Sequence, residues 1–290
     1  MKKILSLFLP IMFSLVWAVT SRAFVNYEDL LPKKIIQVKL TGYDDYAPFG
    51  YFLPSKTNKT GTFASPFKVM MQDLAEKNNM KLNYSVADGS YPERIQDVRQ
   101  GDTDILLGMY YDTKLFEGIE MLFPAAFMNP ITVFMLPNRI DEVKTTDDLK
   151  KLKGVRIQKE IFSDFVEEQL KDYNLITVAD SYGLFEQLFT QKADYILASQ
   201  YYGLIEASKL GLRNQISVAK QTLWQIPMFV GVSKLSRNRK LLEQKIARWL
   251  DSEENRKLLQ QEIINIVDDA EINAQGIVPP NFDNKPNVEQ

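Results

Sequence analysis

The chain of 290 residues carries 35 basic and 37 acidic residues, a formal charge of −2, and 45% of its residues are hydrophobic. It has no histidine and no cysteine, which excludes Ser-His and Cys-His nucleophile pairs, the usual zinc ligand sets and disulfide bonds. The mildly acidic balance argues against nucleic acid as a partner, and we expect no cofactor, no metal site and a monomer.

The first residues have the pattern of an export signal. Two lysines precede the apolar run of residues 4–19, which contains Pro10 and is followed by a small-x-small cleavage pattern ending at Ala23. The run is shorter than the roughly 20 residues of a spanning helix, so we predict a cleavable signal peptide over residues 1–23 and a periplasmic location. The alternative is an uncleaved membrane anchor.

Two further expectations follow from this signal. The chain lacks the cysteine that a lipoprotein needs, so we do not expect a lipid anchor. Cleavage removes three basic residues and no acidic ones, which leaves 32 basic against 37 acidic residues and a formal charge of −5. Roughly 265 mature residues are enough for a large core and about two domains.

The first part of the mature chain reads as a βαβ arrangement. Residues 35–40 form a β-branched strand, and an aromatic loop with Tyr43, Tyr46, Phe49 and Tyr51 follows it. Ser65 and Pro66 open a predicted helix with apolar residues at helical spacing, and residues 80–86 alternate as a second strand. Each loop aromatic either lines a site or covers the core.

The stretch from 94 to 127 organises this half. It contains a short helix, a Gly-Asp turn, a predicted buried strand over residues 105–108 and then a predicted aromatic loop. Ligands of open parallel sheets bind beyond the carboxyl ends of the strands. We therefore expect the residues that follow this strand to contact a ligand.

A second half repeats the order of helix, aspartate and apolar strand. Strands are predicted over residues 155–158, 176–178 and 195–198, Ser163 caps a helix, and SQYYG (199–203) is predicted as a loop matching the first aromatic loop. The chain crosses between the halves near residues 129–136 and again near 224–232. Two crossings predict a hinge.

The C-terminal part is predicted to hold two amphipathic helices over residues 239–250 and 254–266, followed by an extended or disordered tail. The predicted division is a signal peptide (1–23), a discontinuous lobe 1 (24–130 and 231–270), lobe 2 with the hinge strands (131–230) and a tail (271–290). The fold class is α/β, with two lobes, a cleft between them and two hinge crossings.

Several loose motifs in a fixed order carry a family resemblance. They are YAPFGYF, DLAEKNNMKLNYSV, RIQDVRQGDTDILLGM, LFPAAF, DDLKKLKGVRIQ, LFEQLFTQKADYILAS and VGVSKLSRNRKLLEQKIARWL. Across residues 35–266 the chain resembles the periplasmic solute-binding proteins of family 3, the amino-acid ABC transporter class. The resemblance implies a type II periplasmic-binding-protein clamshell that closes on a small molecule and presents it to an inner-membrane permease.

The family's amino-acid contacts do not carry over fully. Thr113 matches the family threonine, but Phe116 stands where the family has the arginine that grips a carboxylate, and Lys114 could supply only a point charge. Glu160 and Ile161 replace the family Gly-Ser/Thr pair, with Ser163 nearby. Ser199 stands where the family has the acidic residue that pairs with the ammonium group of the ligand. We therefore expect either a ligand that is not a standard α-amino acid or a protein that has given up transport.

Aromatic side chains would line the expected cleft and suit a ring or an organic cation. The alternative is that half of them are core residues. The predicted ligand-binding residues are Tyr46, Phe49, Gly108, Met109, Tyr110, Tyr111, Asp112, Thr113, Lys114, Gln158, Ser163, Ser199, Tyr202 and Trp224. We expect no catalytic residue among them.

Three functions remain open from the sequence. The first is binding of a solute for import. The second is sensing, in which the same clamshell reports its ligand to a membrane receptor. The third is an enzyme related to the dehydratases of this fold, for which Asp112 and Glu160 are the candidate carboxylates.

Overall fold

The computed structural model describes residues 34–43, 45–53, 62–84, 91–112, 117–158, 160, 162–220 and 222–282. The predicted signal peptide lies outside these ranges. All helices and strands below belong to the unit from Ile36 to Gln290. Within the described ranges, no helix combines the length and the apolar composition that a membrane crossing needs.

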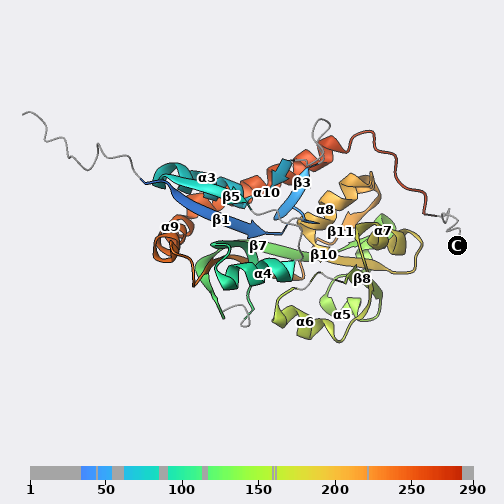
Figure 1. The fold of residues 1–290 in the computed structure, drawn as a ribbon. Helices are drawn as coiled ribbons and strands as arrows, with labels where there is room; N and C mark the ends of the chain where they lie inside the picture. The colour runs from blue at the N-terminus through green and yellow to red at the C-terminus, as the bar shows by residue number, and fades with distance from the viewer. Residues whose placement is uncertain are drawn as a thin grey trace, which may run out of the picture. The chain divides into compact units, whose positions relative to one another are not determined.

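The fold is α/β, with one large mixed sheet, helices packed against it and a small second sheet (Figure 1). The strands are β1 Ile36–Gly42, β2 Asp45–Tyr46, β3 Gly50–Leu53, β4 Thr62–Ala64, β5 Met80–Tyr84, β6 Ile105–Tyr110, β7 Ile119–Met135, β8 Lys153–Ile157, β9 Asn174–Val178, β10 Tyr195–Ser199, β11 Ser217–Val218 and β12 Trp224–Ser233. The α-helices are α3 Phe67–Asn78, α4 Tyr91–Gln100, α5 Thr146–Leu149, α6 Asp164–Leu170, α7 Ser181–Phe189, α8 Gln200–Lys209, α9 Arg239–Asp251 and α10 Glu253–Asn273. Two short 3-10 helices are η2 Pro137–Glu142 and η3 Arg213–Gln215.

The order of the large sheet shows the same arrangement twice. It runs β5-β1-β6-β12-β7-β10-β8-β9, with β11 paired to the far end of β7. In the first half β6 and β5 flank β1 in parallel, and β12 separates β6 from β7. In the second half β10 and β9 flank β8 in parallel, and β7 separates β10 from β11. The predicted repetition of the two halves is confirmed.

Strands β7 and β12 cross from one half to the other as antiparallel neighbours. Trp224 is opposite Ile131, and Ser233 is opposite Ile119. These are the two segments for which the sequence predicted crossings. Their neighbouring positions in the sheet place both connections at the same point of the fold.

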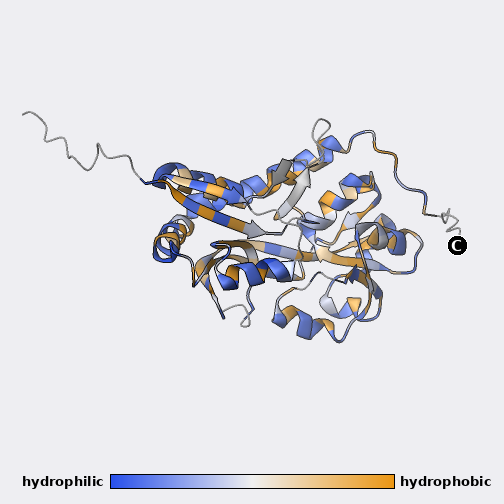
Figure 2. Ribbon diagram, viewed as in Figure 1, coloured by the Kyte–Doolittle hydropathy of each residue, from blue (hydrophilic) through white to orange (hydrophobic). Residues whose placement is uncertain are grey.

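The core fills both faces of the sheet, and the hydrophobic residues concentrate on strands and on inward helix faces (Figure 2). The predicted inward faces of the C-terminal helices are confirmed, because each predicted position is buried: Leu242, Ile246, Trp249, Leu259, Ile263 and Ile266. Helix α10 runs to Asn273, so it extends past the start predicted for the tail. Phe282 then packs against the ring of Phe189 at 5.4 Å.

Several local predictions differ from the structure. Tyr110 belongs to strand β6, and residues 119–127 belong to strand β7, rather than to an aromatic loop. The reason is that the crossing strand β12 pairs with both strands. The second predicted loop is the first turn of α8, which Ser199 caps. Ser65 does not cap α3, since its hydroxyl donates to the Phe49 carbonyl instead.

A β-bulge at Gly108 decides which way the end of β6 faces. Met109 pairs with Phe229 and Leu107 with Val230, so Gly108 is the extra residue on its strand. Its φ of 76° lies in the left-handed region that glycine adopts without a Cβ penalty. The bulge reverses the alternation of side chains, so that Met109 joins the small core cluster with Phe229 while Tyr110 lies in the main cluster.

Candidate functional site

The candidate site lies at the carboxyl ends of four parallel strands, two from each half of the sheet. Tyr46 follows β1, Tyr110 ends β6, Glu160 follows β8, and Ser199 ends β10. This edge of an open α/β sheet is where ligands bind. The position of all four side chains therefore follows from the topology.

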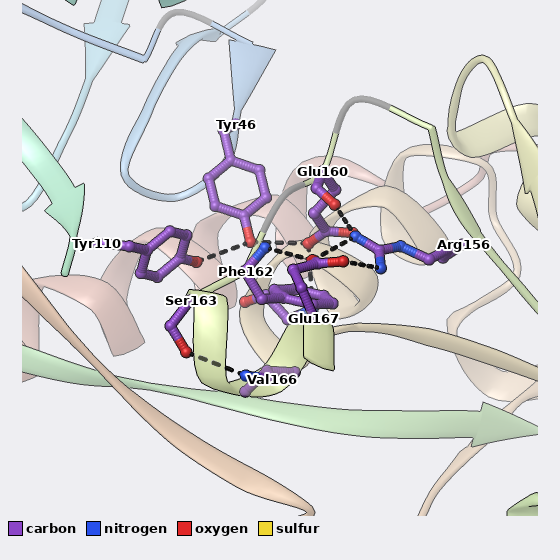
Figure 3. Close-up of polar contacts among 9 residues, drawn as sticks. Tyr46, Tyr110, Arg156, Glu160, Phe162, Ser163, Val166 and Glu167 are labelled. Atoms are coloured by element: carbon purple, nitrogen blue, oxygen red, sulfur yellow. Dashed lines mark hydrogen bonds and ion pairs between the residues drawn. The ribbon is translucent and has the colours of Figure 1, made fainter. Parts of the chain in front are cut away.

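Hydrogen bonds join residues from the two halves (Figure 3). The Tyr46 hydroxyl donates to Glu160 Oε1 at 2.8 Å, and the Tyr46 and Tyr110 hydroxyl oxygens lie 3.2 Å apart. Asn129 Nδ2 donates to the Tyr110 hydroxyl at 2.6 Å, and the Ser199 hydroxyl donates to Asn129 Oδ1 at 2.7 Å. All five residues are buried. The network thus connects β2 and β6 to the ends of β8 and β10 through β7.

An arginine fixes the segment that carries Glu160. The Arg156 guanidinium, on β8, donates to both carboxylate oxygens of Glu167 at 2.9 Å and also to the Glu160 backbone carbonyl. The guanidinium carbon Cζ of Arg156 lies over the Phe162 ring, 4.9 Å from its centre, in a cation-π contact. Glu167 in turn accepts from the Phe162 backbone N–H at 2.8 Å. A bidentate pair of this kind holds its chain segment in one orientation.

Tyrosine rings surround the network on the side of the first half. The Tyr43 and Tyr91 rings stack with centroids 4.0 Å apart, and the Tyr43 and Tyr46 centroids are 5.0 Å apart. The Tyr46 ring also stacks with Tyr202 of α8 at 5.4 Å. Tyr46 therefore joins the two halves both by a hydrogen bond and by an aromatic contact.

Burial controls the protonation of the site. Burial raises the pKa of the Glu160 carboxyl to about 7, although the Tyr46 hydrogen bond and the charge of Arg156 favour the ionised form. Burial and the nearby Glu160 charge also raise the pKa of the Tyr46 hydroxyl well above its ordinary value. The tyrosines are thus neutral donors at neutral pH, and Glu160 is the group that can change charge.

Ten of the fourteen predicted site residues divide into three groups in the structure. Tyr46, Tyr110, Ser199 and Tyr202 come together in the buried network. Phe49, Gly108 and Met109 are packed into the protein: the Phe49 ring stacks on Phe127 at 5.2 Å, Gly108 forms the bulge, and the Met109 side chain lies in the small core cluster. Their contact with a ligand stays a prediction.

The third group borders an open groove of about 610 Å³. Tyr111, Ser163 and Trp224 line it, together with α6 and the first residues of β12. Ser163 caps α6 as predicted, by accepting from the Val166 N–H at 3.4 Å, and Trp224 Nε1 donates to Gln169 at 3.0 Å. The groove lies beside the network, because Tyr111 follows Tyr110 directly.

The remaining four predicted residues belong to none of these three groups. Gln158 is exposed, and its backbone N–H donates to the Val178 carbonyl at 2.9 Å. Asp112 is half-buried at the end of the segment that follows β6. Thr113 and Lys114 lie outside the described residues, so the carried-over threonine contact stays a prediction.

Sequence reasoning missed part of the network. It left out Asn129 and Arg156, because a polar residue within an apolar strand gives no indication of its partner. Glu160 was identified only as a departure from the family pattern and as a candidate carboxylate. The usable signal was its position two residues after the strand predicted over residues 155–158, equivalent to that of the residues after β6.

No protein-family model and no curated protein sequence matches the chain. Among solved structures it is similar to an amino-acid ABC transporter substrate-binding protein from Streptococcus pneumoniae bound to L-arginine, with a TM-score of 0.63 and 12% identity over 81% of this chain and 95% of the other. It is also similar to a histidine kinase sensor domain that resembles periplasmic binding proteins, with a TM-score of 0.58 and 15% identity over 84% and 98%.

A third similar structure is an ancestral amino-acid-binding protein described as a precursor of cyclohexadienyl dehydratase. Its TM-score is 0.59, with 15% identity over 80% of this chain and 95% of that one. These likenesses confirm the predicted fold: the chain has the two-lobed fold of the type II periplasmic binding proteins. The predicted lobe boundaries stay a prediction.

Proposed function

We propose that this protein binds a small organic solute between its two lobes in the periplasm and delivers it to an ABC-type permease of the inner membrane. The observation that carries the proposal is the hydrogen bond from Tyr46 to Glu160, which joins the ends of β1 and β8 across the two halves of the sheet. A contact of this kind forms when the lobes close and breaks when they open. The lobes of this fold close around a ligand that binds both of them.

The two crossing strands supply the hinge in this proposal. Strands β7 and β12 pair with each other where the chain passes between the halves, so a small change of twist there would move both connections together. Hinge motions need only a few residues that absorb backbone rotation. Closure would then exclude water from Tyr46, Tyr110, Glu160 and Ser199, which we propose as the ligand-contacting residues.

The proposed ligand is not a standard α-amino acid. A zwitterion needs a cationic group for its carboxylate, and the arginine of this site, Arg156, already forms a bidentate pair with Glu167. The polar groups of the network are instead hydroxyls, an amide and the Glu160 carboxyl. This composition favours a guest that donates hydrogen bonds or carries positive charge.

Sensing is the second candidate function. It is supported by the similarity to a histidine kinase sensor domain, which covers 84% of this chain. The same closure would then be reported to a membrane receptor rather than to a permease. Deletion of the gene distinguishes the two: loss of uptake of the bound solute supports import, whereas retained uptake with a lost transcriptional response supports sensing.

Turnover is the property that would separate a binding protein from a dehydratase-like enzyme. The proposal expects the bound solute to be recovered unchanged after prolonged incubation. Nuclear magnetic resonance spectra of the released ligand test this directly. Appearance of a dehydrated product would assign the function to the enzyme class and make Glu160, the buried carboxyl of the site, its candidate acid.

The binding function is tested by a thermal-shift screen followed by X-ray scattering. The screen would contain amino acids, polyamines, aromatic acids and quaternary amines. We expect at least one solute to raise the melting temperature and to reduce the radius of gyration by closing the lobes. Stabilisation without compaction would contradict closure. Micromolar binding of ordinary L-amino acids alone would contradict the proposed ligand class.

A further inference from the structure

One oxygen of the Glu160 carboxyl has no hydrogen-bond partner among the residues that the structure describes. Oε1 accepts from the Tyr46 hydroxyl at 2.8 Å and from the Ser199 backbone N–H at 3.5 Å, whereas Oε2 is buried and accepts from no described residue. The residue as a whole is 8% exposed. A buried carboxylate oxygen without a hydrogen bond is costly, so its position needs a physical explanation, and a bound ligand is one.

The charges around Glu160 do not balance. Arg156 contributes one positive charge and Glu167, with which it pairs at 2.9 Å, contributes one negative charge. Arg156 reaches Glu160 through the backbone carbonyl and not through the carboxylate. An ionised Glu160 therefore adds a negative charge that no side chain among its described neighbours pairs with directly.

Tyrosine rings gather on the side of this carboxyl where Tyr46 donates to Oε1. Burial raises the pKa of the hydroxyls of Tyr43, Tyr46, Tyr110 and Tyr202, and the Glu160 charge adds to each shift. The rings are in mutual contact, with 5.0 Å between Tyr43 and Tyr46 and 5.4 Å between Tyr46 and Tyr202. Tyrosine faces attract cations, most strongly where water is excluded.

We propose that Glu160 and the surrounding tyrosines form a subsite for an organic cation, an amine or a quaternary ammonium group that pairs with the free Oε2 atom. This inference rests on the proposed function and names the ligand class of that site. Oε2 would receive the missing charge partner, and the rings of Tyr46 and Tyr202 would contact the cationic group. The Tyr46 hydroxyl would keep its bond to Oε1, which couples the bound cation to closure.

Binding in this subsite would be linked to pH. Burial raises the pKa of Glu160 to about 7, so an increase from about pH 6 to about pH 8 takes the carboxyl from mostly protonated to mostly ionised. The groups that face it are Tyr46 on β2, Tyr43 after β1, Tyr110 on β6, Arg156 on β8, Glu167 on α6 and Tyr202 on α8. A cation that needs ionised Glu160 should bind about tenfold more tightly at pH 8 than at pH 6.

The probes are choline, putrescine and guanidinium, with 3,3-dimethylbutan-1-ol as the neutral isostere of choline. Calorimetric titration of the full mature protein at pH 8 should show binding of at least one cation and at least tenfold weaker binding of the isostere. E160Q should weaken the binding of that cation by about thirtyfold or more, the usual effect of losing one partner of a buried charge pair. The matched control E168Q removes an exposed carboxylate from α6 and should bind as the wild type does.

The outcomes separate this inference from the proposed function. If no cation binds at pH 8, or if E160Q binds the cation as tightly as the wild type, the cation subsite is wrong. A neutral or anionic solute found in the screen would then leave the solute-binding function standing. If E160Q does not fold, the tenfold pH dependence in the wild type decides, because an affinity that is equal at pH 6 and pH 8 overturns the inference.

Discussion

The two halves of the sheet have the same strand arrangement but present different chemistry at their carboxyl ends. The first half presents tyrosines, among them Tyr46 and Tyr110, which are neutral at physiological pH. The second half presents the ion pair of Arg156 and Glu167 and the ionisable carboxyl of Glu160. The repeated topology therefore fixes where the candidate side chains lie, whereas the identity of the residue after each strand fixes their chemistry.

The largest expected effect is a pH dependence of stability that comes from Glu160, in the second half of the sheet. Glu160 has a folded pKa of about 7, above its ordinary value of 4.5, so between these values the folded state holds a proton that the unfolded state releases. The free energy of unfolding should therefore fall as the pH rises through this window, by about 3 kcal/mol. E160Q should abolish this contribution.

Urea denaturation at several pH values between about 5 and 8 measures this contribution as the difference between wild type and E160Q. The control E168Q changes an exposed carboxylate and should keep the wild-type slope. Equal slopes for wild type and E160Q would mean that Glu160 is not buried as the structure has it. The buried network would then not be the site of charge change.

Loss of the arginine should cost about 2 kcal/mol of stability. R156A removes the charged partner of the Glu167 carboxylate, which keeps only the Phe162 N–H, and it removes the donor to the Glu160 carbonyl. Removing one partner of a buried pair is strongly destabilising. The estimate is reduced because the Glu167 side chain is 32% exposed and partly solvated. K171A, which breaks the exposed pair with Glu168 on the same helix, should change stability by less than about 0.5 kcal/mol.

Chemical denaturation of R156A and K171A compares a half-buried ion pair with an exposed one. Equal stabilities of the two variants would contradict the structural role of Arg156.

The first half is most sensitive at its bulge. G108A should destabilise the protein by about 1 to 2 kcal/mol, because Gly108 has a φ of 76° and an added Cβ would lie 3.2 Å from the Phe67 ring. The change should also disturb the direction of Tyr110, which follows the bulge by two residues. Denaturation measures the first effect, and the melting shift caused by a bound solute measures the second. If G108A is as stable as the wild type and binds the solute normally, the bulge does not determine the orientation of the Tyr110 side chain.

The smallest loss of stability is expected at the hydrogen bond between the neutral side chains of Ser199 and Asn129. S199A removes the hydroxyl that donates to Asn129 at 2.7 Å and leaves a buried amide oxygen without its donor. The expected loss is about 1 kcal/mol, the typical value for one neutral hydrogen bond. A loss as large as that of R156A, measured under the same conditions, would show that the neutral and the charged parts of the network do not differ as proposed.

Much of the fold could be predicted from the sequence because hydrophobic periodicity records it. The amphipathic helices, the repeated βαβ order and the two crossings follow from apolar spacing and from Asp-before-strand patterns, and each is present in the structure. The length of β7 and the end of β6 could not be predicted. Residues 119–127 look like an aromatic loop in isolation and become strand only because β12 pairs with them.

The candidate site was predictable in position but not in partners. Tyr46, Tyr110 and Ser199 were found because they follow strands that end at the same edge of the sheet. Asn129 was missed because it lies within β7, where a polar side chain has no sequence signal to identify its neighbours. The direction of Tyr110 depends on the Gly108 bulge, which spacing alone does not show.

The most direct test of the account is the number of protons released when a cation binds. Calorimetric titration near pH 7 with whichever of the three probe cations binds, in two buffers with different enthalpies of ionisation, gives this number for wild type and for E160Q. We expect the wild type to release about half a proton per cation bound, because Glu160 is about half protonated near its pKa and the cation holds it ionised. Cation binding with no proton released from the carboxyl, or with the same release in E160Q, would contradict the cation subsite.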